Sequence, residues 1–241
     1  MAEAEAACRR AFFSLFSMKY WLLLLVLAAR LPAPPAAWAQ PSALHLAPPA
    51  EQALRLAVAQ LRRGLAQDQA RRHPVPGTPH AAGPRLFFLA EAANKITLAY
   101  APATAPGQQA GRAYAVRYHR LTQHWGLFDN DAADVLAAYL LLSWQVVHNA
   151  PDTTAVAQAA AQGLRVQTAS VLARHLPTTA AAAQFGEQLK RHAVLLHRGW
   201  QQAGQGPAGA AYRQRVAASW QAQYHLDLRT LHLTAQGLNQ P

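Results

Sequence analysis

Cysteine is almost absent from this sequence, which has one such residue, Cys8, in 241. Cys8 lies in an N-terminal segment that we expect to be removed. The mature chain would then have no disulfide, no thiolate nucleophile and no thiolate metal ligand. A chain of about 200 residues buries enough apolar surface to fold without such cross-links.

Acidic residues are also scarce, with 11 Asp and Glu against 22 Lys and Arg, for a formal net charge of +11. Lysine occurs only at Lys19, Lys95 and Lys190, so arginine carries most of the excess. Such a balance favours anionic partners, including phosphates, lipid head groups and acidic glycans. The alternative is codon bias in a GC-rich genome, with arginines spread over solvated helix faces. We prefer this alternative for the arginine excess.

The N-terminal apolar run is short. Tyr20–Ala29 follows Lys19 and spans ten residues, whereas a membrane-spanning helix needs about 20. Ala37-Trp38-Ala39 then supplies a small-x-small site, which completes the pattern of a secretory signal peptide. We therefore expect export from a bacterial cell, to the periplasm or outside, with signal peptidase cutting between Ala39 and Gln40.

Two questions about this segment stay open. Translation could begin at Met1 or at Met18, because a signal peptide is complete from Met18 onward. An uncleaved anchor over 11–29 is the alternative to cleavage, but it would bury Lys19 at a cost of about 2.5–3.5 kcal/mol. Cleavage removes a net charge of +2 and leaves +9. We expect no stable membrane span after cleavage.

The remaining sequence predicts a proline-containing linker over 40–50 and one helical domain over 51–241. Apolar residues at helical spacing predict helices over 49–69, 107–126, 131–149, 152–174, 178–202 and 207–224. The 131–149 segment is apolar on every face and should be the central core helix. A short helix over 85–95, a brief strand over 95–100 and a folded-back tail from Leu226 are also expected. The fold class is all-α, a single-domain bundle of five or six helices after the signal peptide.

The segment from Gly126 to Gln145 includes Gly-Leu-Phe-Asp-Asn-Asp and Ser-Trp-Gln. It resembles the central motif of an uncharacterised family of exported bacterial helical proteins, a domain of unknown function. The tail over 226–237 and Tyr100-Ala101-Pro102 are similar to other parts of that family. The resemblance covers roughly residues 95–237. It implies a helical fold and export, and it carries no known chemistry.

The densest acidic group of the mature chain is Asp129, Asn130, Asp131 and Asp134. A helix-loop-helix calcium site needs a glycine at its sixth position and a glutamate at its twelfth. Counted from Asp129, these positions hold Asp134 and Leu140, so that loop is excluded. We expect Asn130 or Asp131 to cap the following helix, with Asp134 near its positive end.

The histidines do not have the spacing of a helical zinc site. His119 and His124 are five residues apart, as are His192 and His197. Five residues rotate a helix by about 140°, so each pair faces two directions. Zinc pairs on one helix use four-residue spacing. We expect no metal and no cofactor.

Catalytic candidates are few. A cell-wall hydrolase would need a carboxylic acid, and Glu91 is a better candidate than Glu187, which lies beside Lys190 and Arg191. Ser143 lacks the glycine-flanked turn of a nucleophilic serine.

The leading hypothesis is a non-enzymatic exported interaction protein that binds an anionic envelope component; a hydrolase using Glu91 is the alternative. The predicted anion-binding residues are Lys190, Arg191, Arg198, Arg213 and Arg215. His197 follows Lys190 by seven residues, and Arg198 follows Arg191 by seven. All four side chains should therefore share one helix face. His197 should add charge below pH of about 6.5.

Overall fold

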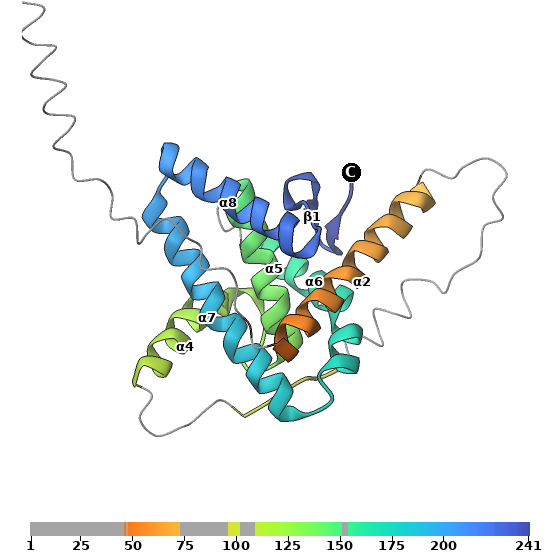
Figure 1. Ribbon diagram of the computed structural model, residues 1–241, viewed down its shortest axis with the longest axis vertical. Helices are drawn as coiled ribbons and strands as arrows, with labels where there is room; N and C mark the ends of the chain where they lie inside the picture. The colour runs from red at the N-terminus through yellow and green to blue at the C-terminus, as the bar shows by residue number, and fades with distance from the viewer. Residues whose placement is uncertain (1–45, 47, 73–95, 102–108, 151–153) are drawn as a thin grey trace, which may run out of the picture. The chain divides into compact units, whose positions relative to one another are not determined.

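The computed structural model describes residues 46, 48–72, 96–101, 109–150 and 154–241. The predicted signal peptide, the Ala39–Gln40 cleavage site, most of the linker and the 85–95 helix with Glu91 lie outside these residues. The described residues form six α-helices, two short 3₁₀ helices and one hairpin, which confirms the all-α bundle (Figure 1). The elements are α2 (Pro48–Arg72), α4 (Gln109–Thr122), η2 (Gln123–Trp125), α5 (Ala132–His148), α6 (Thr154–His175), α7 (Thr179–Ala203), α8 (Pro207–Tyr224), η3 (Leu228–Thr230), β1 (His232–Thr234) and β2 (Gly237–Asn239).

Helix α5 is the centre of the core, as predicted. Nearly every side chain from Ala132 to Val146 is buried, and α5 packs against α6, α7, α8 and η3. Figure 1 shows α5 in green among these helices. Because this helix has apolar side chains on all of its faces, it can be stable only inside the bundle.

The predicted helix ends are close to the observed ones because the capping signals are strong. Thr178 caps α7 by accepting a hydrogen bond from the Ala181 amide, and Asn149 ends α5 in the left-handed conformation. Gly126 ends η2 in that conformation too, with φ of 67°. The start of α2 differs slightly from expectation. It begins at Pro48, within the predicted linker, because proline is tolerated in the first turn of a helix.

The predicted strand over 95–100 is wrong for its described residues. One bridge, between Ala99 and Asp131, replaces a continuous strand. The Tyr100 amide donates to the Asn130 carbonyl at 2.9 Å, and the Ala132 amide donates to Leu98 at 3.1 Å. Pairing stops there because the partner segment turns into α5 at Ala132.

The C-terminal tail folds back over the bundle, as expected, and forms a hairpin. Strands β1 and β2 pair antiparallel, with Leu233 opposite Leu238. The hairpin packs on α6, where Gly163 permits the approach: an added Cβ would lie 2.2 Å from the Gln236 carbonyl carbon. Gln167 of α6 donates to the Leu238 carbonyl at 2.9 Å and accepts from the Leu238 amide at 3.2 Å.

Trp144 of α5, Trp200 of α7 and Trp220 of α8 differ in burial. Trp220 is 2% exposed. Trp144 and Trp200 are half-buried. Trp144 donates its indole N–H to the Leu231 carbonyl at 2.8 Å, and Trp200 donates to Asn149 Oδ1 at 3.4 Å. Both therefore combine apolar packing with a polar contact to another segment.

Candidate functional site: a cavity between α2, α6 and the hairpin

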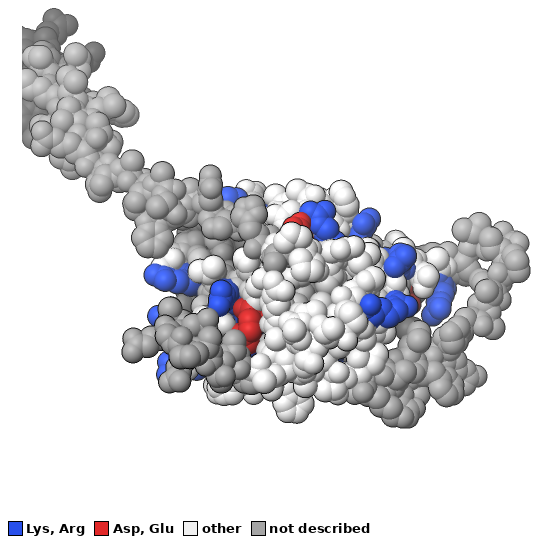
Figure 2. All heavy atoms as spheres, turned by 60° about the horizontal axis from the view of Figure 1, so that its bottom comes forward, with Lys and Arg blue, Asp and Glu red and all other residues white. Residues whose placement is uncertain are grey.

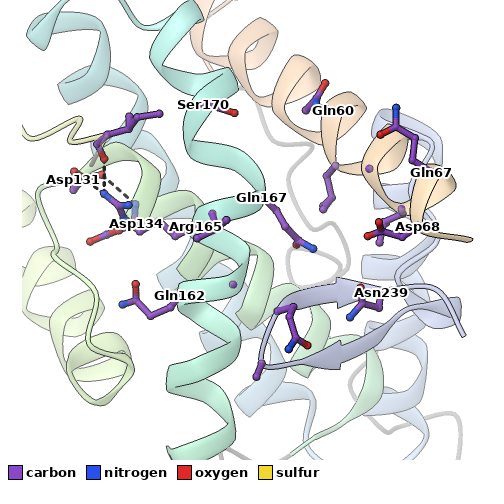
Figure 3. Close-up of a pocket in the computed structure, with 18 of the residues that line it drawn as sticks. Gln60, Gln67, Asp68, Asp131, Asp134, Gln162, Arg165, Gln167, Ser170 and Asn239 are labelled. Carbon is purple, nitrogen blue, oxygen red and sulfur yellow. Dashed lines mark hydrogen bonds and ion pairs between the residues drawn. The ribbon is translucent and has the colours of Figure 1, made fainter. Parts of the chain in front are cut away.

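A cavity of about 920 Å³ lies between α2, α6 and the C-terminal hairpin, and it extends to the loop after η2. In Figure 3, Gln167 of α6 and Asp68 of α2 lie on either side of the space between these helices, with Asn239 of the hairpin nearby. Ligand cavities in proteins have volumes of about 300–1,000 Å³. This cavity therefore has room for a small organic ligand.

Side-chain amides are the main polar groups of the cavity. A carboxamide both donates and accepts hydrogen bonds, so a set of them suits a ligand rich in hydroxyl or amide groups. Six line the cavity: Gln60, Gln67, Gln162, Gln167, Gln236 and Asn239.

Several of these amides keep hydrogen-bonding capacity. Gln162 uses its NH₂ group to donate to the Gly126 carbonyl at 3.0 Å. The Gln60 oxygen accepts from Arg63 at 2.9 Å. The opposite end of each amide has no partner among the described residues, and Gln67 has none there at either end.

Gly64, in the middle of α2, also lines the cavity. A Cβ atom at Gly64 would meet nothing within 4 Å. At Gly163, Gly186, Gly199 and Gly209, the other helical glycines whose surroundings are described, an added Cβ would lie closer than 3.0 Å to a neighbour. Those four are explained by packing, but Gly64 is not. A mid-helix glycine costs about 0.5–1 kcal/mol relative to alanine, so Gly64 keeps this wall open at a cost in stability.

A buried charge cluster forms another part of the wall. Arg165 pairs with Asp134, and its Nη2 lies 3.9 Å from Asp131 Oδ2 and 2.6 Å from the Ile96 carbonyl oxygen. The exposed fractions of Arg165, Asp131 and Asp134 are 8%, 3% and 2%. Figure 3 shows the cluster where α6 meets the start of α5. It ties α6 to α5 and to the segment before Leu98.

The capping prediction is confirmed for Asp131. Its Oδ1 accepts from the amides of Ala133 at 2.9 Å and Asp134 at 3.3 Å, and its Oδ2 accepts from Leu98 at 2.9 Å. Asn130 does not cap; its side chain donates to the Tyr100 carbonyl at 3.3 Å.

Asp134 does more than face the helix N-terminus. Its Oδ2 accepts from the Phe128 amide at 2.8 Å, while its Oδ1 accepts from Arg165. Burial raises the pKa of Asp134, and the Phe128 amide and Arg165 guanidinium oppose that rise. Since both oxygens already have donors, this carboxylate holds the fold together and has no oxygen directed at a ligand.

The seven-residue spacing predicted a solvated face shared by Lys190 and Arg191, and this prediction is wrong for Lys190. It is 3% exposed, pairs with Glu187, and its Nζ lies 5.5 Å from the centre of the Tyr100 ring. Glu187 also accepts from the Tyr114 hydroxyl. Lys190 stands next to Leu189 at the edge of the apolar stripe, and a partly buried acid and an aromatic ring stabilise its charge there.

The other predicted anion-binding residues do not form one patch. Arg191 and Arg198 are exposed on α7, with Arg191 5.0 Å from the centre of the Tyr114 ring. Arg213 and Arg215 are half-buried on α8, and two positions rotate a helix by about 200°. Arg213 contacts Asn149 Oδ1 at 3.4 Å, whereas Arg215 lies over Tyr212. On the face in Figure 2, basic residues gather at its edges around a wide uncharged area.

His197 is half-buried, with its ring edge-on to Trp200 at 6.2 Å between centroids. Burial lowers the pKa of His197 below its usual value. The expected gain of charge below pH of about 6.5 is therefore shifted to more acidic conditions.

Neither histidine pair gathers ligands for a metal. His119 pairs with Asp129 at 2.7 Å, and Thr122 donates to the other Asp129 oxygen at 3.2 Å. No group of three or more His, Cys, Asp or Glu side chains with metal-binding geometry occurs in the described part of the chain.

Among the described residues, no helix combines the length and the apolar character needed to cross a lipid bilayer.

Comparisons of the chain with protein-family models, with curated proteins and with solved structures find no match. The resemblance over 95–237 stays a prediction.

Sequence reasoning did not find the cavity. Its amides come from α2, α6 and the hairpin, and single glutamines on helices are ordinary surface residues. Gly64 was the one local signal, because glycine interrupts a sequence that is otherwise strongly helix-forming.

Proposed function

We propose that the protein is a non-enzymatic exported binding protein, and that its ligand enters the cavity between α2, α6 and the hairpin. The open space in front of Gly64 supports this proposal most directly. Packing explains the other described helical glycines, whereas Gly64 costs stability and only enlarges a cavity in which several amides keep hydrogen-bonding capacity.

The carboxylates of the cavity favour binding over hydrolysis. Glycoside hydrolysis needs two carboxyl groups directed at the scissile bond. Asp131 and Asp134 accept backbone amides and Arg165 instead, and Asp68 lies 3.9 Å from Arg71. The alternative, an envelope hydrolase using Glu91, predicts a hydrolytic activity that Glu91→Gln abolishes while ligand binding survives.

Export is part of the proposal and has its own test. N-terminal sequencing of the protein from a periplasmic or culture fraction should begin at Gln40. Recovery of residues 1–39 on the protein in the membrane fraction would instead support the uncleaved anchor.

We also propose that Arg191 and Arg198 bind an anionic envelope component. Both are exposed, they lie two turns apart on α7, and neither has an acidic partner among the described residues. Lys190 is left out because it is buried and already paired with Glu187.

The cavity proposal is tested by filling the cavity from Gly64. Gly64→Phe places a ring in the open space, while Gly64→Ala also raises the helix propensity of α2 but adds little volume. Thermal unfolding of both variants and the unmodified protein is measured with oligosaccharides, tripeptides and fatty acids. A ligand at a hundred times its Kd stabilises by about 2.7 kcal/mol, which raises the Tm of a domain of this size by about 5–10 °C.

At least one class of compound should raise the Tm of the unmodified protein and of Gly64→Ala, but not that of Gly64→Phe. The proposal is wrong if no class raises the Tm, or if the increase persists in Gly64→Phe.

A further inference from the structure

We infer that the ligand of this cavity is a neutral oligosaccharide, an inference that rests on the binding function proposed above. Four features indicate the ligand class. They are the charge of the lining, the chemistry of its polar groups, one exposed aromatic ring and the hydrogen bonds already made at the edge of β2.

The charge of the cavity differs from that of the whole chain. Its lining contains the acidic residues Asp68, Asp131 and Asp134 and the basic residues Arg71 and Arg165. Their formal charges sum to −1, in a chain whose net charge is +11. Most of these groups are also paired with one another. An anionic ligand would gain nothing here, so a neutral ligand fits best.

The remaining polar groups suit hydroxyls. Every sugar hydroxyl donates and accepts a hydrogen bond, and a carboxamide can pair with it in both senses. The lining adds the hydroxyl groups of Thr97 and Ser170 to its six amides. The side chains of Gln67, Thr97 and Ser170 have no hydrogen-bond partner among the described residues, so they are available to a ligand.

Phe128 supplies an aromatic surface at one end of the cavity. It is 72% exposed, which makes it the most exposed large apolar side chain of the described residues. Its backbone is held in place, because the Phe128 amide donates to the buried Asp134 at 2.8 Å. The negative face of an aromatic ring attracts the weakly positive C–H groups on one face of a sugar ring. Phe128 can therefore hold a sugar against the mouth of the cavity.

The cavity is long enough for more than one sugar. Its lining residues on α6 run from Gln162 to Ser170, a distance of about 12 Å at 1.5 Å per residue. Gln162 contacts the loop beside Phe128 through the Gly126 carbonyl, and Ser170 lies farther along the same helix. A chain of sugars can thus contact Phe128 and the distant amides together.

An extended peptide is disfavoured by the hairpin. Peptides often bind by adding a strand to a free sheet edge. Here the Leu238 amide and carbonyl, on the edge of β2 that faces α6, already pair with the side chain of Gln167. No main-chain ladder can form at that residue unless Gln167 is displaced.

The test measures binding of neutral hexasaccharides of glucose, xylose and N-acetylglucosamine to the purified protein by isothermal titration calorimetry. At least one should bind, and Phe128→Ala and Gln67→Ala should each weaken it about tenfold, the equivalent of one good contact. The matched control is Val116→Ala, which removes another exposed apolar side chain, on α4. It should leave the affinity unchanged, and circular dichroism should show that all variants fold.

The failures of the two proposals are distinct. If tripeptides or fatty acids bind, Gly64→Phe blocks them and no hexasaccharide binds, the sugar inference is wrong and the binding function stands. If a hexasaccharide binds equally well to Phe128→Ala and Gln67→Ala, the sugar inference is also wrong. If nothing binds the unmodified protein, both proposals fall.

Discussion

The side chain of Gln167 forms a two-way amide pair with the backbone of Leu238. Its Nε2 donates to the Leu238 carbonyl at 2.9 Å, and its Oε1 accepts from the Leu238 amide at 3.2 Å. Leu238 is fully buried, so these two backbone groups would otherwise lack partners in the interior. Gln167 acts as a neighbouring strand would, and it thereby fixes the hairpin that bounds the proposed ligand cavity.

Replacing Gln167 should loosen this hairpin. Gln167→Met keeps much of the side-chain volume and leaves both Leu238 backbone groups unsatisfied, at a cost of about 2–3 kcal/mol. Urea unfolding measures the change, and faster hydrogen exchange at the Leu238 amide should locate it. Gln162→Met is the control, because Gln162 is exposed and makes a single bond to Gly126. Equal stability of the two variants would contradict this role for Gln167.

The buried pair of Arg165 and Asp134 gives a second prediction. Arg165→Met leaves Asp134 buried without its cation, which should cost about 3–5 kcal/mol. Adding Asp134→Asn should recover much of the loss, because it removes the uncompensated charge.

The stability of Arg165→Met should also depend on pH differently from that of the unmodified protein. Burial raises the pKa of Asp134, and loss of the guanidinium removes an opposing effect, so the folded-state pKa rises further above the unfolded value. The folded state then binds protons more readily, and stability falls as pH rises through this range. Denaturant unfolding should show a larger deficit at neutral pH than in acid. A deficit that does not vary with pH would contradict the charge as its cause.

The sequence predicted α5 and α7 best, because two independent signals agreed at each of them. Apolar spacing marked the buried faces of α5 and α7, and Asp131 and Thr178 supplied caps at their starts. The folded-back tail was predicted from its leucines. Its hairpin was not, since β1 and β2 have only three residues each and β2 is held on α6 by Gln167, a residue far away in the sequence.

The site was much less predictable. Lys190 was expected on a solvated helix face because of its spacing to His197, and its burial depends on Glu187, Tyr100 and Tyr114, two of which are far away in the sequence. The cavity depends on α2, α6 and the hairpin meeting, which no local pattern encodes.

His197 gives a prediction on acid stability. Burial lowers the pKa of His197, so below its unfolded pKa of about 6.5 the unfolded state binds more protons. Stability is therefore full above that pH and falls as the solution is acidified toward the folded-state pKa. His197→Gln should reduce this fall, as measured by urea midpoints across pH 5 to 8. His232→Gln, at an exposed position on β1, should leave it intact. An unchanged pH profile in His197→Gln would show that another group is responsible.

Arg191 and Arg198 give the last prediction, which concerns the proposed anionic partner. Both are exposed on α7 without an acidic partner among the described residues. Attraction between exposed charges is screened by salt, so affinity for heparin or anionic vesicles should be measurable at low salt and fall steeply as salt is added. Arg191→Gln with Arg198→Gln should abolish most of it. Arg55→Gln is the control, because it removes the same charge from an arginine already paired with Glu51 at 2.7 Å. If the control weakens binding by half as much as the double variant, attraction follows net charge, and α7 presents an ordinary solvated face.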